Sequence, residues 1–157
     1  MATCLVAGRA AADLARPSGK TILTVGGRIR NTNDGAEAIF DLAMLDALGN
    51  TSFTTSTPWT DKPNRWEGVP LATLMAAVGA DGTTLRATAL NDYVVDMPLA
   101  GLDVEGAILA DRRNGVPMPI SDKGPLFIVY PFDDRPELRK QAVYMRCAWQ
   151  VARLDVL

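Results

Sequence analysis

Two segments of the chain have apolar residues at helical spacing. In residues 41–48, leucines recur at every third position and Gly49 follows as a stop, which predicts a short packing helix. In residues 69–78, apolar side chains recur three and four positions apart, Pro70 suits the first turn, and Gly79 follows. This second segment is the clearest helix in the chain.

The other patterned segments favour β-strands, because they are rich in β-branched residues and are bounded by turn residues. The expected strands cover residues 20–29, 52–57, 83–90, 93–97, 107–111 and 125–130. A polar loop is expected as far as Arg65, a short helix at 136–140, and a long strand, or two strands with a bend, at 143–156. Several strands with a few interspersed short helices predict an α+β fold with a mixed β-sheet or barrel-like core.

Length and composition fit one domain. The chain has 157 residues, of which 48% are apolar and 22% charged, so it can bury a sizeable core without disulfides or a structural metal. We assign residues 20–157 to this domain and residues 1–19 to an N-terminal extension. The Ala- and Leu-rich extension is interpreted either as the remnant of an export signal or as a frayed terminus. The first interpretation predicts a periplasmic or secreted protein, and the second leaves a cytoplasmic location open.

The charge balance and the absent residue types exclude several classes of function. Lys and Arg total 16 against 18 Asp and Glu, without a sustained basic run, so nucleic acid is not expected as a partner. No apolar run approaches the roughly 18 residues that span a membrane. The chain has no histidine and only two cysteines, Cys4 and Cys147, which argues against a zinc site, a His-based triad and a disulfide. Cys147 lies in an apolar run and is expected to be a small core residue.

Five short sequence blocks resemble a known protein family in their residues and in their order along the chain. They are Trp-Glu-Gly-Val-Pro-Leu at 66–71 with its continuation to 75, Ala-Leu-Asn-Asp-Tyr at 89–93, Ile-Leu-Ala at 108–110 leading to Asn-Gly-Val-Pro-Met-Pro at 114–119, Gly-Pro-Leu-Phe-Ile-Val-Tyr-Pro at 124–131, and Trp-Gln-Val at 149–151. Over about residues 20–157 the chain resembles the molybdopterin-binding domain of the sulfite-oxidase-like oxidoreductases. The resemblance implies the α+β fold of that family. Function does not follow from it, because each block also has a structural interpretation as a helix start, a hairpin turn or a buried strand.

The chain departs from the family at the positions that hold the cofactor. Catalytic members carry a molybdenum-ligating cysteine a little over ten residues before the Gly of the Gly-Val-Pro-Leu block, and here that spacing falls on Thr55, Ser56 and Thr57. Hydroxyls are poor replacements for a soft thiolate. Phe127 stands where cofactor-binding relatives have Arg, and the usual Gly- and Lys-containing segment does not precede Trp149. We therefore expect no cofactor, with molybdopterin as the alternative, and assign no catalytic or metal-binding residue.

If a pocket remains where the cofactor would lie, residues from several of these segments should line it. The expected ligand-binding residues are Thr55, Ser56, Thr57, Trp59, Asn91, Asp92, Tyr93, Asp122, Lys123 and Arg146. Hydroxyls, an amide, an aromatic wall and one or two cations suit a small polar or anionic ligand. The alternative is structural: Asn91 and Asp92 form a turn, Tyr93 is a core residue and Trp59 covers a helix.

Three functions are compatible with this pattern. The first is a cofactor-free module that binds a small ligand or a partner protein, as a sensor or accessory component. The second is a molybdopterin-dependent oxidoreductase with atypical cofactor binding. The third is a hydrolase or isomerase with Asp92 or Asp122 as the base and Tyr93 or Ser56 assisting, but no nucleophile motif supports it.

Overall fold

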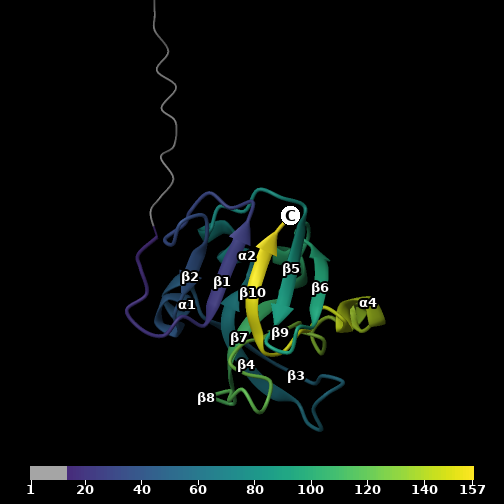
Figure 1. Ribbon diagram of the computed structural model, residues 1–157. Coiled ribbons are helices and arrows are strands. Elements are labelled where there is room, and N and C mark those ends of the chain that lie inside the picture. The colour runs from purple at the N-terminus through teal and green to yellow at the C-terminus, as the bar shows by residue number, and fades with distance from the viewer. Residues whose placement is uncertain (1–13) are drawn as a thin grey trace, which may run out of the picture.

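The computed structural model describes residues 14–157, in which ten strands form two open sheets (Figure 1). The strands of the first sheet, in spatial order, are β2 (Ala38–Phe40), β1 (Leu23–Gly27), β10 (Val151–Val156), β5 (Thr84–Ala89) and β6 (Val94–Pro98). β1 and β10 are parallel, and every other neighbouring pair in this sheet is antiparallel. The last strand of the chain therefore joins the N-terminal β1–β2 pair to the β5–β6 hairpin.

The second sheet is antiparallel and is centred on β7. Its strands are β3 (Thr51–Thr55), β4 (Asn64–Pro70), β7 (Ile108–Arg113), β8 (Val116–Pro117) and β9 (Phe127–Val129). A register shift between β4 and β7 occurs at Gly68, where a Cβ atom would collide with the Leu109 carbonyl group. The Gly of the Trp-Glu-Gly-Val-Pro-Leu block is thus required by close approach of two strands.

Short helices lie between the strands. They are α1 (Leu42–Leu48), α2 (Leu71–Ala77), α3 (Leu102–Glu105), the 3₁₀ helix η1 (Pro136–Leu138) and α4 (Gln141–Tyr144). The Asp41 carboxylate caps α1 by accepting a 2.8 Å hydrogen bond from the Met44 amide. It also accepts a 2.8 Å bond from the Gly19 amide, so the segment just before β1 is tied to this helix start. In the part of the chain that is described, no helix is long and apolar enough to cross a membrane.

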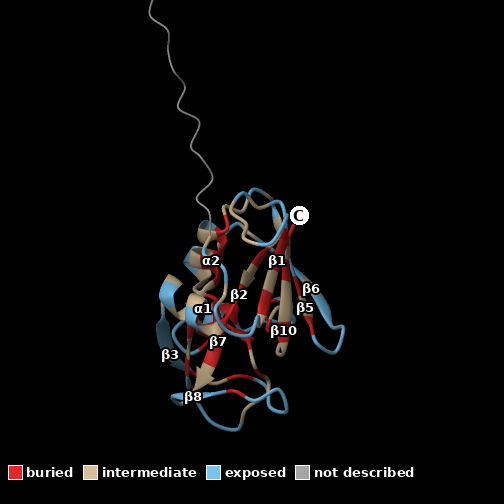
Figure 2. Cartoon of the chain, turned by 60° about the vertical axis from the view of Figure 1, so that its left-hand side comes forward, coloured by how far each residue is buried: buried red, intermediate tan, exposed pale blue. Residues whose placement is uncertain are grey.

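Apolar side chains from both sheets and from α1 and α2 form one hydrophobic core. Figure 2 shows the buried residues concentrated along the strands, with exposed residues in the loops and at β3 and β6. The largest fully buried side chains include Trp66, Phe40, Phe127, Tyr130 and Phe132. Three of these, Trp66, Phe127 and Tyr130, belong to the resemblance blocks. Trp66 and Phe127 meet edge to face with 5.2 Å between ring centroids.

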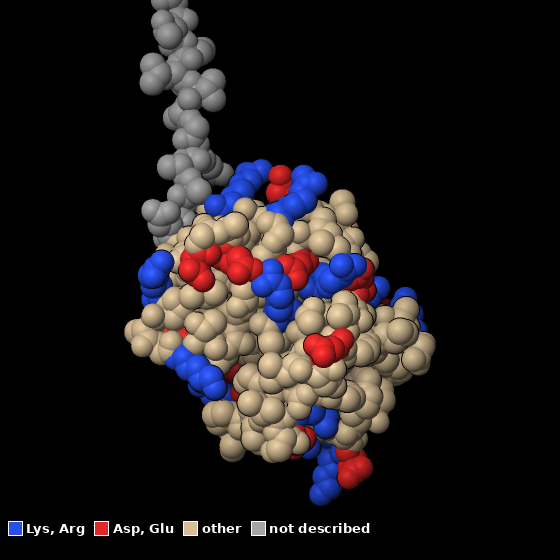
Figure 3. Space-filling model, in the orientation of Figure 1, with Lys and Arg blue, Asp and Glu red and all other residues tan. Residues whose placement is uncertain are grey.

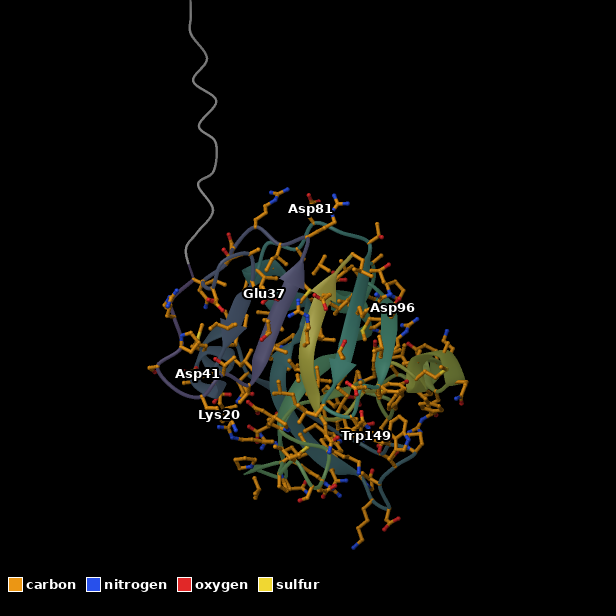
Figure 4. All side chains as sticks on the ribbon, in the orientation of Figure 1. Lys20, Glu37, Asp41, Asp81, Asp96 and Trp149 are labelled. Atoms are coloured by element: carbon orange, nitrogen blue, oxygen red, sulfur yellow. The ribbon has the colours of Figure 1, made fainter. Side chains whose placement is uncertain are left out.

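The outer face of the first sheet carries a band of alternating charge. Arg153 pairs with Glu37 at 2.6 Å and with Asp155 at 2.8 Å, and Arg86 pairs with Asp96 at 2.8 Å. Figure 3 shows the band crossing the sheet, and Figure 4 labels Glu37 and Asp96 toward its two ends. Because these charges are already paired on an exposed surface, each contributes little to stability.

The α+β class with mixed sheets and a few short helices is confirmed, and within residues 14–157 no barrel closes. The helix expected at 69–78 begins only at Leu71, because residues 64–70 form strand β4 with alternating burial. The polar loop, which was expected to reach Arg65, therefore ends before Asn64, where β4 begins. Strand β2 and helix α3 were not expected from the sequence.

The segment 143–156 differs most from its prediction. Only 151–156 is a strand, whereas the chain before it forms the end of α4 and an irregular segment to Gln150. Val143 and Cys147 are four residues apart and both buried, which is a helical spacing. This error matters for the site, because α4 and the segment after it form one of its walls. Cys4 and most of the proposed extension 1–19 lie outside the described residues.

Candidate functional site

A cavity of about 330 Å³ opens where the β3–β4 loop, the β5–β6 turn and α4 meet. Its lining residues are Pro58, Trp59, Asn91, Tyr93, Gln141, Tyr144, Met145, Cys147, Ala148 and Trp149. Figure 4 shows Trp149 at the lower end of the first sheet, on the side of α4. The segments that meet there are far apart in the sequence, so the cavity depends on the fold.

Aromatic rings form the main wall of this cavity. Trp59 stands edge to face with Trp149 at 5.6 Å between ring centroids and with Tyr144 at 6.2 Å. Behind them, the fully buried Phe127 contacts both tryptophans, with centroid distances of 6.2 Å. Such a cluster presents rigid apolar surface, since aromatic side chains held on several sides lose few further rotamers when a ligand binds.

The β5–β6 turn also lines the cavity, through Asn91 and Tyr93. The Asn91 side-chain oxygen accepts a 3.2 Å bond from the Tyr93 amide, and Asp92 has a left-handed backbone with φ 66°. Asn91 and Asp92 therefore form a turn, as the structural interpretation expected. Tyr93 is not a core residue, since 41% of its surface is exposed and its hydroxyl donates a 2.7 Å bond to the Met145 carbonyl. This bond joins the turn to the end of α4.

The hydroxyls of Thr55, Ser56 and Thr57 are engaged within the protein. Thr55 is fully buried, and its Oγ1 accepts a 3.0 Å bond from the Asp133 amide and donates a 3.1 Å bond to the Ser56 carbonyl. The Ser56 hydroxyl donates a 2.6 Å bond to the Asp133 carboxylate. Thr57 Oγ1 shares a 2.9 Å bond with the Thr60 hydroxyl. None of the three residues lines the cavity.

Asp133 receives both the amide and the hydroxyl of Ser56, and it also pairs with Arg139. These hydrogen bonds, that of the Ser56 hydroxyl first, hold the pKa of Asp133 below its usual range. The Thr-Ser-Thr segment thus fastens the end of β3 to the loop that follows β9. The sequence could not reveal this role, because the partner lies 77 residues further along the chain.

The charged residues expected at the site have other partners. Asp122 pairs with Arg113 at 3.4 Å, and the Lys123 ammonium lies 5.7 Å from the ring centroid of Trp149. Arg146 pairs with Glu105 at 3.2 Å, and 18% of its side chain is exposed. Of the ten expected residues, Trp59, Asn91 and Tyr93 line the cavity and the other seven do not.

The residues that sequence reasoning missed come mainly from the segment 141–149. Gln141, Tyr144, Met145, Ala148 and Trp149 line the cavity, but a strand was expected through most of this segment. Trp149 was recognised only as part of a resemblance block. The helical spacing of Val143 and Cys147 is the signal that could have placed them.

The donor groups present do not fit a molybdenum–thiolate centre of the kind that the resemblance implies. Cys147 is 4% exposed, its Sγ lies 3.7 Å from the Val143 carbonyl, and burial raises the pKa of its thiol, so it stays protonated. The hydroxyls at the expected ligand position are hydrogen-bonded elsewhere, and Phe127 is packed among tryptophans. Within residues 14–157, no cluster of three or more His, Cys, Asp or Glu side chains could hold a metal ion.

A separate titratable cluster joins α1 to β7. The Arg112 guanidinium contacts both oxygens of Asp46, at 3.1 and 3.2 Å, and one oxygen of Asp111 at 3.3 Å. Burial, followed by the hydrogen bond and charge of Asp46, raises the pKa of Asp111 to about 7. Neither carboxylate lines the aromatic cavity, so this perturbed group gives no support to the proposed Asp92 or Asp122 base.

Comparison with known proteins supports the fold and nothing finer. No family model matches the sequence, and a search of the curated proteins found no match. Among solved structures, the sulfane dehydrogenase SoxCD from Paracoccus pantotrophus is similar, with a TM-score of 0.64 and 18% sequence identity. The likeness covers 85% of this chain but only 37% of that chain.

At this identity the likeness concerns the fold alone. This structural likeness agrees with the resemblance of the sequence blocks, which predicted the same fold from the residues alone. The chain therefore has a sulfite-oxidase-like α+β fold, shared with part of the sulfane dehydrogenase chain.

Proposed function

We propose that this chain is a binding domain of the sulfite-oxidase-like fold, which takes a small ligand in the cavity between Trp59 and α4 and works without a molybdenum cofactor. The observation that carries the proposal is the composition of the cavity wall. Three aromatic residues, Trp59, Tyr144 and Trp149, stand together with the side-chain amides of Asn91 and Gln141. Apolar surface with a few polar groups is the usual makeup of small-molecule sites.

The residues at the expected cofactor positions have structural roles instead. The hydroxyl of Thr55 supports the Asp133 loop from a fully buried position. Phe127 fills the space beneath the two tryptophans, where a guanidinium could not be solvated or paired. Both substitutions serve packing and hydrogen bonding in a cofactor-free domain. A sensor or accessory role, acting through ligand or partner binding, follows from this proposal.

The second candidate is an oxidoreductase that holds molybdopterin in an atypical way. It is favoured only by the likeness to a dehydrogenase, and that likeness spans a minor part of the other chain. Such an enzyme would need cofactor ligands other than the residues at the expected positions. The molybdenum and pterin content of the purified protein distinguishes the two candidates.

Ligand binding itself is tested by recording amide NMR spectra of the protein with a library of fragment-sized compounds. We expect fragments to shift the amides of Asn91, Tyr93 and residues 141–149 together. As a control, the compounds should not shift the distant turn at Gly35. If no fragment perturbs the cavity amides at millimolar concentration, the proposed binding function is wrong.

A further inference from the structure

We infer that the ligand of this cavity is an uncharged, flat ring compound that carries carbonyl or ring-nitrogen acceptors. The inference rests on the proposed binding function and adds the chemical class of the ligand. It departs from the anionic ligand that the sequence suggested. Three properties of the cavity support it: its lack of charge, its unpaired donors and its aromatic walls.

The cavity is lined without any charged side chain. Of the cations next to lining residues, Lys123 lies over the ring of Trp149 and Arg146 pairs with Glu105, whereas Lys140 does not line the cavity. An anion that enters an aromatic cavity loses its hydration and gains no counter-charge there. The arrangement therefore selects against anionic ligands.

Several donors on the lining residues have no protein partner. Among residues 14–157, no intramolecular hydrogen bond involves the indole N–H of Trp59, the indole N–H of Trp149 or the hydroxyl of Tyr144, and none of these atoms is fully buried. Asn91 uses its side-chain oxygen within the turn, which leaves its NH₂ group as a donor. An indole N–H can only donate, so the complementary ligand presents acceptors.

The size and walls of the cavity favour flat rings. Its volume of about 330 Å³ lies at the lower end of the range for small-molecule sites, which suits one or two fused rings. Trp59, Tyr144 and Trp149 meet edge to face, and aromatic surfaces of this kind attract further rings in stacked or T-shaped contacts.

The inference is tested with three probes that share one ring system. They are 2-naphthamide, which is neutral and has a carbonyl acceptor, 2-naphthoate, which is an anion of the same shape, and 2-methylnaphthalene, which has no acceptor. Affinities are measured by amide NMR titration of the full chain. We expect 2-naphthamide to bind at least about tenfold more tightly than either of the other probes, because one unmet polar or charged group costs that much or more.

Two lining variants separate charge from hydrogen bonding. Gln141→Lys adds a cation at an exposed lining position and should raise the affinity for 2-naphthoate, whereas Ala36→Lys adds the same charge at a distant exposed turn and should not. Tyr144→Phe keeps the ring and removes the hydroxyl, so it should weaken 2-naphthamide and leave 2-methylnaphthalene unchanged.

The possible failures point to different conclusions. If 2-naphthoate or 2-methylnaphthalene binds the wild-type cavity as tightly as 2-naphthamide, the ligand class is wrong while the binding function stands. If none of the probes and no library fragment perturbs the cavity amides, the binding function and the ligand class both fail.

Discussion

The buried hydroxyl of Thr55 gives the sharpest prediction about stability. The substitution Thr55→Val replaces the hydroxyl by a methyl group of similar size, so packing changes little. The Asp133 amide then loses its 3.0 Å acceptor, and the Ser56 carbonyl loses a 3.1 Å donor. Thr55 is fully buried, but both hydrogen bonds are only partly buried, so water can replace part of what each partner loses.

The expected cost follows from the unpaired amide. Leaving a buried donor unsatisfied costs about 1–3 kcal/mol, and this amide is only partly buried, so we expect the free energy of unfolding to fall by roughly 1 kcal/mol. With a urea m-value of about 2 kcal/mol/M, the unfolding midpoint should decrease by about 0.5 M. The assay is urea denaturation followed by tryptophan fluorescence and circular dichroism.

Thr54→Val is the matched control, because Thr54 is exposed on the same strand. It should change the free energy of unfolding by no more than about 0.5 kcal/mol. If Thr55→Val is equally mild, the hydroxyl does not support the Asp133 loop. The proposal that this segment supports the fold and does not hold a cofactor would then lose its structural basis.

Three further predictions concern titration, the cavity mouth and the buried thiol. The pKa of Asp111 in the folded state is about 7, above its ordinary value of 3.8. Between about pH 4 and 7 the folded state keeps the proton that the unfolded state releases, so the free energy of unfolding should fall as the pH rises through this range. Asp111→Asn should flatten this part of the pH profile in denaturation experiments, and an unchanged profile would contradict the assignment. Tyr93→Phe removes the 2.7 Å bond to the Met145 carbonyl and should cost less than about 1 kcal/mol, while amide hydrogen exchange in α4 becomes faster; unchanged exchange would show that the bond does not hold α4. Cys147 is buried with a raised thiol pKa, so peptide-resolved mass spectrometry should find it unmodified by iodoacetamide until urea unfolds the chain, and rapid modification of the native protein would disprove its burial.

Local sequence patterns predicted helices α1 and α2, because the spacing of apolar residues within each segment is enough to indicate a helix. The leucine spacing before Gly49 predicted α1, and the apolar spacing of residues 71–78 predicted α2. The start of α2 was placed early, because Val69 and Pro70 suit a helix start as well as a strand end. Strand β4 became visible only when β3 and β7 paired with it, which is tertiary information.

The candidate site was predictable only in part, because most of its contacts join residues that are far apart in the sequence. Trp59, Asn91 and Tyr93 were expected near one another because the resemblance places all three around the expected cofactor position. The use of the Ser56 hydroxyl by Asp133, and of Arg146 by Glu105, depends on residues 77 and 41 positions away. Side-chain partners at such separations leave no local pattern in the sequence. Polar residues that form hydrogen bonds within the fold were therefore interpreted as ligand-binding residues.

The most direct test of a cofactor-independent binding domain is the molybdenum content of the full chain. The protein is purified from a host that makes molybdopterin, and molybdenum is measured by mass spectrometry against protein concentration. A molybdenum-dependent enzyme produced in the same host serves as the positive control. The account predicts molybdenum at background level, and a stoichiometric amount that remains with the folded protein would contradict it.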